Sequence, residues 1–238
     1  ALREARRLKL PCVVCFGLTG SYPGANLRHC RFMLEGLAET KERLAARGIG
    51  FVLRLGEPDE VALSLSRKAA LAVVDCGYTR IQRRWRRRAA RAMECPLFEV
   101  ESEAVVPVKI ASQKEEYAAA TIRPKISRLL PRFLVPAGEM KPFAGSLDTG
   151  FRSESLRDID SLIAKLSLEE GVAPVEGAKG GTGEARRKLK RFIEEGLARY
   201  DEDRSDPSKA GGSNLSAHLH FGQISPVEVA LAVKKRGG

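Results

Sequence analysis

The sequence predicts an α/β protein with a doubly wound parallel sheet in its first part, then a long linker, then the start of an all-α domain. Three observations lead to this expectation. Apolar runs of strand length alternate with helical patterns through the first part, and a stretch rich in glycine and proline then breaks the periodicity. After that stretch only helical patterns occur. Because strands that alternate with helices join through right-handed crossovers, the first part should form one Rossmann-like sheet.

The alternating part begins with a helical tail at residues 1–9. The run from Cys12 to Leu18 is continuously apolar, which is typical of a strand buried on both faces of a parallel sheet. Helices are expected at residues 27–47, from Pro58 and from Thr79. The predicted strands are residues 12–18, 51–55, 71–75 and 96–100.

The helix that begins at Thr79 carries an arginine run around Trp85, the only tryptophan in the chain. Two interpretations stay open. The run can bind a nucleic-acid backbone by charge and stacking, or it can be a solvated helix face. In the second case the apolar stripe is Ile81, Trp85, Ala89 and Met93 or Ala92. The spacing of four favours the second interpretation. The arginines are Arg80, Arg83, Arg84, Arg86, Arg87, Arg88 and Arg91.

Two domains and a linker follow from these patterns: an N-terminal α/β domain at residues 1–134, an interdomain linker at 135–181, and the beginning of a helical domain at 182–238. Within the first, an extended piece is expected at 105–108, a helix at 111–121, and a break around Pro124. The linker is expected to hold one helix, at residues 155–168. A helix capped by Thr182 should carry a stripe that ends at Tyr200 and points it inward.

Composition favours a polyanionic partner. The chain has 238 residues, of which 43% are hydrophobic, enough to build cores. Forty-one Lys and Arg against 30 Asp and Glu give a net charge of +11, so nucleic acid is the natural candidate. The alternative is a basic surface whose charge is partly neutralised in helix i,i+4 pairs.

Several classes of site are disfavoured. No apolar run long enough for a membrane span and no signal peptide is visible, so a cytoplasmic protein is expected. Five scattered cysteines indicate reduced thiols, and His218 and His220 lack partners at metal-ligand spacing. The sequence also lacks a Walker loop and a Gly-x-Gly-x-x-Gly motif. No cluster of side chains that could catalyse a reaction is visible, so a cofactor is expected to carry any reaction.

The most informative stretch is Ser213-Asn-Leu-Ser-Ala-His-Leu-His-Phe-Gly-Gln-Ile-Ser225. Ser213, Asn214 and Ser216 place hydrogen-bonding groups ahead of a short apolar turn, an arrangement that suits a phosphate. Gly222 ends that turn, and Ser225 with Glu228 predicts a capping box for a helix that runs to about residue 235. The alternative interpretation is that these residues are ordinary caps between two packed helices.

This stretch resembles the flavin-binding signature of the DNA photolyase family, in the form found in class II cyclobutane pyrimidine dimer photolyases. Three further segments agree in order and spacing with that family: Arg31-Phe-Met-Leu-Glu-Gly-Leu37, the segment 111–125, and Arg204-Ser-Asp-Pro-Ser-Lys209. The resemblance covers nearly the whole chain. It implies an N-terminal α/β domain, a linker and an all-helical FAD-binding domain.

The resemblance also implies an activity: light-dependent repair of pyrimidine dimers in double-stranded DNA, by an electron from reduced FAD. Family positions that contact the flavin correspond to Tyr200, Gly212, Ser213, Asn214, Leu215 and Ser216. Arg204 corresponds to a position near the lesion and the DNA. The family further suggests a monomer and a second, antenna chromophore in the α/β domain. Other interpretations are a cryptochrome-like signalling flavoprotein and a basic nucleic-acid-binding module without cofactor.

The chain departs from the family pattern in several places. Gly211-Gly212 replaces bulkier residues, so Gly212 can offer only its backbone. Ser205 stands where asparagine is common, and Ala217-His218 replaces the usual Pro-Tyr.

The resemblance further implies that the family pattern is longer than this chain. The family's first strand would lie before Ala1. Most of its flavin pocket, with the electron-transfer tryptophans, would lie beyond Gly238, so no catalytic residue is assigned within the chain. We therefore expect a fragment that is inactive alone and binds FAD weakly or not at all.

Overall fold

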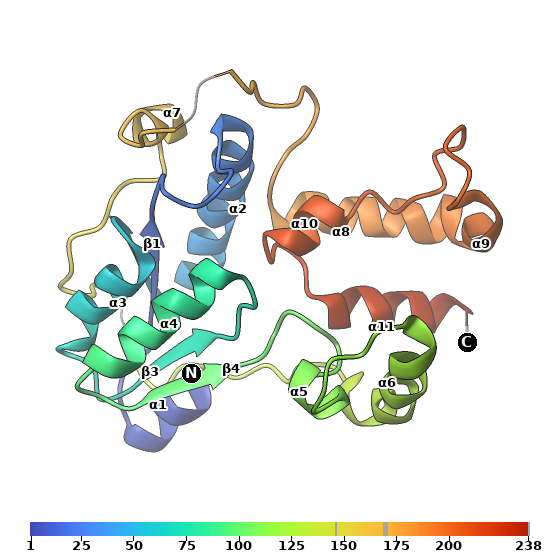
Figure 1. The fold of residues 1–238 in the computed structure, drawn as a ribbon. Coiled ribbons are helices and arrows are strands. Elements are labelled where there is room, and N and C mark those ends of the chain that lie inside the picture. The colour runs from blue at the N-terminus through green and yellow to red at the C-terminus, as the bar shows by residue number, and fades with distance from the viewer. Residues whose placement is uncertain (146, 169–170, 238) are drawn as a thin grey trace. The chain divides into compact units, whose positions relative to one another are not determined.

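The computed structural model describes residues 1–145, 147–168 and 171–237, which form two compact units (Figure 1). Unit 1 consists of residues 1–100 and 139–181, and unit 2 consists of residues 101–138 and 182–238. Each unit is therefore built from two separate stretches of chain. The units divide the chain differently from the domain boundaries predicted at 134 and 181, and those boundaries stay a prediction.

One prediction concerns the end of the chain. The electron-transfer tryptophans and most of the flavin pocket were expected beyond Gly238, and Gly238 itself lies outside the described residues. The structure therefore does not test where those groups lie, and this expectation stays a prediction.

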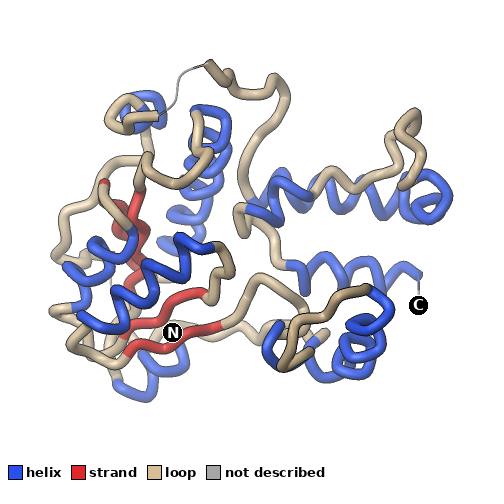
Figure 2. Tube along the Cα trace, in the orientation of Figure 1, coloured by secondary structure: helices blue, strands red, loops and turns tan. Residues whose placement is uncertain are grey.

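The strands of the described residues lie in unit 1 and pair in parallel (Figure 2). One pair is β1 with β2, and the other is β3 with β4. The predicted α/β class with parallel strands is confirmed. The single continuous sheet is not found among the described residues, because β3 and β4 bond to each other and share no ladder with β1 or β2. The bounds are β1 Val13–Leu18, β2 Gly50–Leu55, β3 Ala72–Asp75 and β4 Leu97–Val100.

The helices of unit 1 begin and end at residues suited to those positions. The Asn26 side chain accepts a hydrogen bond from the backbone N–H of His29 at the start of α2, and Gly48 follows the helix with φ of 73°. Pro58 opens α3, and Thr79 forms a capping box with Gln82 at α4. The helices are α1 Leu2–Leu8, α2 Leu27–Ala46, α3 Pro58–Ser66, α4 Arg80–Ala92 and α7 Ile159–Ile163.

The two faces of β2 contribute to different apolar clusters, because successive side chains of a strand point to opposite sides. Phe51 and Leu53 belong to a cluster that includes residues of α2 and α7, whereas Val52 packs with Val61 and Leu65 of α3. β2 therefore has helices on both faces, as predicted for a doubly wound arrangement. β1 differs from the prediction: only Leu18 is buried and Cys15 is exposed, so the apolar run does not correspond to a strand covered on both faces.

The predicted linker contributes to the core of unit 1. Its only described helix is α7, shorter than predicted, and Leu156, Leu162 and Ile163 join the cluster around α2. Beside β2, Leu53 donates its N–H to the Ser153 hydroxyl at 2.9 Å and accepts a bond from the Glu154 N–H at 2.8 Å. These residues cover the strand and its cluster.

The first part of unit 2 differs from the predicted secondary structure. Residues 105–106 form a bend in place of the expected extended piece at 105–108, and α5 (Val108–Ala111) begins shortly after them. Helix α6 (Ala119–Phe133) begins later than the helix expected at 111–121. Glu116 accepts hydrogen bonds from Lys125 of α6 and from Ser112, which lower its pKa to about 2. This network fixes residues 112–118 as a loop. Helix α6 continues through Pro124, which removes only one backbone donor.

The second part of unit 2 is helical. Helix α8 (Thr182–Arg191) is followed by a π-helical turn, η1 (Phe192–Gly196), a 3₁₀ turn, η2 (Leu197–Arg199), and α9 (Tyr200–Asp203). Helices α10 (Ser216–His220) and α11 (Pro226–Gly237) come after a loop. The buried cluster of these segments consists of Ala185, Leu189, Leu215 and Ile224.

Candidate functional site

The predicted phosphate-binding stretch lies on the surface at the start of α10. Gly212, Asn214 and Ser216 are exposed and Ser213 is half-buried, whereas Leu215 is buried and packs in the α8 cluster. Leu215 can therefore meet a ligand only through its backbone. Asn214 adopts a left-handed conformation with φ of 55°, uncommon for a residue other than glycine, so the backbone turns sharply here. The first residues of α10 receive no side-chain cap, so the capping interpretation does not hold here.

Tyr200 is 36% exposed, which corrects the prediction that it points inward. The cause is the π-helical turn at Phe192–Gly196, which adds a residue to the turn and rotates the following side chains off the stripe of Ala185 and Leu189. Its ring meets Phe192 edge-on with centroids 5.4 Å apart. Tyr200 thus packs on one aromatic ring and is partly exposed to solvent.

The loop between Tyr200 and Ser213 folds back on α9. Asp203 is buried and binds Lys209 at 2.6 Å and Arg199 at 3.5 Å. A Cβ atom at Gly211 would lie 2.6 Å from the backbone carbon of Asp203, so only glycine permits this approach. Gly212, in contrast, has open space around its Cα. The two adjacent glycines therefore differ in role: the first closes the loop and the second exposes backbone.

Arg204, the predicted DNA contact, is exposed at the end of α9. Its guanidinium lies 5.9 Å from the centre of the Tyr200 ring and 3.8 Å from the Asp201 carboxylate. Both contacts are at the surface, where they restrain the side chain weakly. The structure thus brings Arg204 and Tyr200 together. Arg204 can turn towards an anion without breaking a buried interaction.

His218 is a buried polar residue of the predicted phosphate-binding stretch. Its side chain is fully buried, and Nδ1 lies 2.9 Å from Oε1 of Gln223, to which it donates. Burial lowers the pKa of His218, so the ring stays neutral near pH 7. The predicted capping box at Ser225 is only half formed: the Ser225 hydroxyl accepts from the Val227 N–H at 3.2 Å, whereas Glu228 pairs with Arg186 of α8. Gly222 ends α10 with φ of 64°, as predicted.

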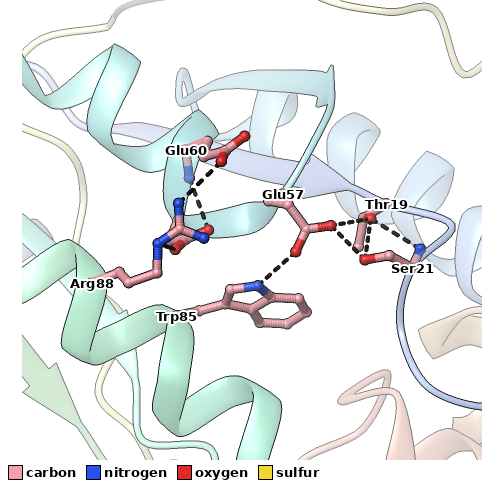
Figure 3. A network of polar contacts seen from close by, with 7 residues as sticks. Thr19, Ser21, Glu57, Glu60, Trp85 and Arg88 are labelled. Atoms are coloured by element: carbon pink, nitrogen blue, oxygen red, sulfur yellow. Dashed lines mark hydrogen bonds and ion pairs between the residues drawn. The ribbon is translucent and has the colours of Figure 1, made fainter.

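A second polar cluster, which sequence reasoning missed, lies beyond the carboxyl ends of β1 and β2 (Figure 3). Glu57 accepts hydrogen bonds from the Thr19 hydroxyl at 2.7 Å, from the Ser21 hydroxyl at 2.5 Å and from Nε1 of Trp85 at 2.8 Å. These bonds, chiefly the one from Ser21, lower the pKa of Glu57. Glu57 therefore joins the β1 loop, the start of α3 and the middle of α4. The sequence feature that could have pointed to Glu57 is its position directly before a helix that begins with proline.

The same cluster excludes base stacking by Trp85, one part of the first interpretation of the arginine run, and supports the apolar stripe of the second. Trp85 is buried and its indole is hydrogen-bonded, so it cannot stack on a base. Ala89 is buried with it, as the apolar-stripe interpretation predicted. Arg88 pairs with Asp59 and Glu60 of α3, each at 3.1 Å. Helix α4 is therefore fixed on α3, with which it packs side by side (Figure 1).

We expect Glu57→Gln to destabilise unit 1 by about 1 kcal/mol at pH 7, because it replaces a charged acceptor by a neutral one. The folded pKa of Glu57 is depressed, so its stabilisation is present above the unfolded pKa and is lost as pH falls through the folded value. Urea unfolding followed by Trp85 fluorescence should thus give different curves for the parent and the Glu57→Gln variant at pH 7, and the curves should converge at acidic pH. A difference in the free energy of unfolding that stays constant with pH would contradict the role given to the Glu57 carboxylate.

The DNA photolyase family model matches residues 1–143. The chain therefore belongs to the DNA photolyase family, as the resemblance of the flavin signature suggested.

Curated relatives extend the match over the rest of the chain. A deoxyribodipyrimidine photo-lyase from Methanothermobacter thermautotrophicus is 42% identical over 237 residues, covering 100% of this chain and 52% of the relative. Proteins of the same name from Potorous tridactylus and Arabidopsis thaliana are 34% and 33% identical over 99% of the chain, and 44% and 49% of those relatives is covered. The chain thus spans about half the length of the curated relatives it matches.

Solved structures share the fold at low identity. A class III photolyase from Agrobacterium tumefaciens has a TM-score of 0.65 and 19% identity, over 93% of this chain and 47% of that one. An archaeal photolyase from Sulfolobus tokodaii with two FAD molecules has the same TM-score and identity, over 96% and 49%. A cryptochrome from Synechocystis has a TM-score of 0.73 and 14% identity, over 99% and 52%. Within the described residues, no helix is long and apolar enough to cross a membrane.

Proposed function

We propose that this chain functions in a light-dependent DNA photolyase, which repairs cyclobutane pyrimidine dimers in double-stranded DNA with FAD as cofactor. The observation that carries the proposal is the 42% identity, over the whole chain, to a protein named deoxyribodipyrimidine photo-lyase. The net charge of +11 is in keeping with a DNA partner. Bound reduced FAD would supply the electron that splits the dimer on illumination.

The residues at the start of α10 suit the pyrophosphate of the flavin. The Ser213 and Ser216 hydroxyls and the Asn214 amide can donate to phosphate oxygens, and the open surroundings of Gly212 leave its backbone accessible. Tyr200 has a solvent-facing ring that can pack against the cofactor. In this proposal, residues 182–238 begin the FAD-binding domain and Leu215 anchors the stretch in its core.

We assign Arg204 to the DNA. Its guanidinium is exposed and only weakly paired with Asp201, so a phosphate oxygen can replace that carboxylate without a loss of buried contacts. Ser205 follows it with a hydroxyl in place of the common asparagine, which offers one donor instead of two. The α/β unit would hold a second, antenna chromophore, a proposal supported by the solved photolyase with two FAD molecules.

The test uses the protein expressed at the full length of its gene. We expect the purified protein to carry flavin, and blue light to restore pyrimidines in a dimer-containing duplex. The matched control is the same sample in the dark. Flavin without repair would instead favour the cryptochrome-like signalling role. Absence of flavin would favour a basic module that binds nucleic acid without a cofactor.

A further inference from the structure

Helix α4 presents a row of arginines that the flavin and lesion sites do not use. Arg80, Arg84, Arg87 and Arg91 follow one another at intervals of four, three and four, which places them in a single line along the helix. All four are exposed. The row extends over about 16 Å at 1.5 Å per residue. We call these four residues the α4 arginine row.

The row is held by side chains on other faces of the helix. Trp85 donates to Glu57 at 2.8 Å, Arg88 pairs with α3, and Arg86 lies 3.3 Å from the Glu99 carboxylate of β4. The capping box of Thr79 fixes the first turn. The helix is therefore immobilised by contacts that leave the arginine row free to face solvent.

Within the described part of the chain, none of the four row arginines forms an ion pair with a carboxylate. Arg84 lowers the pKa of Glu57 through its charge, but that carboxylate already accepts bonds from Thr19, Ser21 and Trp85. Among the described residues, Arg80, Arg87 and Arg91 thus have no carboxylate in an ion pair, unlike Arg86 and Arg88, and Arg84 acts on Glu57 only through its charge.

This arrangement opposes the stability of the helix. Like charges four residues apart repel, and α4 has no acidic residue in its first turn, where the helix dipole disfavours arginine. A bound anion would remove both penalties. A row that destabilises its own helix and lies opposite the anchored face is expected of a binding surface rather than of a solubilising one.

We propose that the α4 arginine row binds the phosphate backbone of duplex DNA without reading its sequence, as a contact additional to Arg204. Over about 16 Å, one strand of B-DNA carries about five phosphates, which matches four guanidinium groups in a line. Guanidinium also binds phosphate in bidentate geometry. Because Trp85 is buried and bonded, base stacking contributes nothing here.

A membrane surface fits the row less well. An interfacial helix inserts an apolar face into the lipid, but the apolar face of α4, with Trp85 and Ala89, is buried in unit 1. The choice of DNA among polyanions rests on the proposed function, since the family acts on DNA. The proposed contact itself needs neither a lesion nor a flavin.

The test measures binding of the protein expressed at the full length of its gene to a short, undamaged, labelled duplex by fluorescence anisotropy in the dark, over a series of salt concentrations. In the row variant, Arg80, Arg84, Arg87 and Arg91 are replaced by glutamine. The matched control replaces four exposed arginines of unit 1 outside α4 and has the same net charge: Arg3→Gln, Arg7→Gln, Arg43→Gln and Arg67→Gln. The thermal melting of both variants is followed by circular dichroism.

We expect the row variant to reduce the slope of log affinity against log salt by about three to four, and to weaken binding at least about tenfold near 0.1 M salt. The control should keep most of the parental slope, and the row variant should melt no lower than the parent. Equal losses in both variants would mean that net charge alone acts, and an unchanged slope in the row variant would overturn the proposal.

Displacement of the duplex by polyglutamate at equal charge concentration would show that the row accepts any polyanion, and the assignment to DNA would then fail. Because the duplex is undamaged and the measurement is made in the dark, the result is independent of repair. A full-length protein that lacks flavin or repair activity would refute the proposed function and leave this measurement interpretable.

Discussion

Replacing Ser213 and Ser216 together by alanine should lower flavin affinity of the full-length protein by about two to four orders of magnitude. Each hydroxyl bond to the pyrophosphate is expected to contribute about 1.5–3 kcal/mol, because the acceptor is charged. The loss of both bonds therefore corresponds to a decrease in flavin affinity of about two to four orders of magnitude. The backbone donors remain in the variant, so some binding should persist. Flavin occupancy during purification and titration of the stripped protein would measure the effect.

Measured after the flavin is stripped, the melting temperature of the same variant should stay close to that of the stripped parent, because α10 has no side-chain cap to lose. Ser225→Ala is the matched control: its hydroxyl accepts the Val227 N–H at 3.2 Å, so this variant should lose about 1 kcal/mol of stability and keep its flavin. A Ser213 and Ser216 double variant that melts lower but retains stoichiometric FAD would exclude these side chains from the flavin site.

Leu215→Ala should destabilise the helical segments of unit 2 by about 2–5 kcal/mol, the usual range for leucine truncation in a packed core. Leu215 is 1% exposed and packs with Ala185, Leu189 and Ile224. Hydrogen exchange of α8 and α10 amides measures the effect, since the tryptophan of the chain lies in unit 1.

The matched control is Leu219→Ala, four residues further along the same helix and 39% exposed. It should change exchange of the α8 amides little, because it removes little buried area. If both truncations accelerated exchange equally, helix propensity in α10 and not the shared cluster would govern the stability of this region. The assignment of Leu215 as the anchor of the candidate flavin stretch would then be wrong.

Elements with strong local signals could be predicted from the sequence. Helix α2 has an asparagine cap at Asn26 and a glycine at Gly48, and α4 has a threonine cap and an apolar stripe through Trp85. The strand runs and the flavin-like stretch were equally local. The family followed from such stretches, and the model match to residues 1–143 supports it.

Features set by contacts distant in sequence could not be predicted. Ser153 and Glu154 bind β2 across about a hundred residues, so a stretch predicted to be a linker is part of the core. Lys125 fixes the loop around Glu116 and moves the helix start to Ala119. The exposure of Tyr200 depends on a π-helical turn, which a fixed period of 3.6 residues does not anticipate.

The interleaved course of the chain through its two units has a consequence for synthesis on the ribosome. The cluster around Leu34 is complete only when Leu156, Leu162 and Ile163 have emerged, after all of residues 101–138. At about 5–20 residues per second, the apolar face of α2 would wait about 3–13 seconds for them after residue 100 is added. A nascent chain that is stalled before residue 156 should therefore bind chaperones more strongly than the finished one.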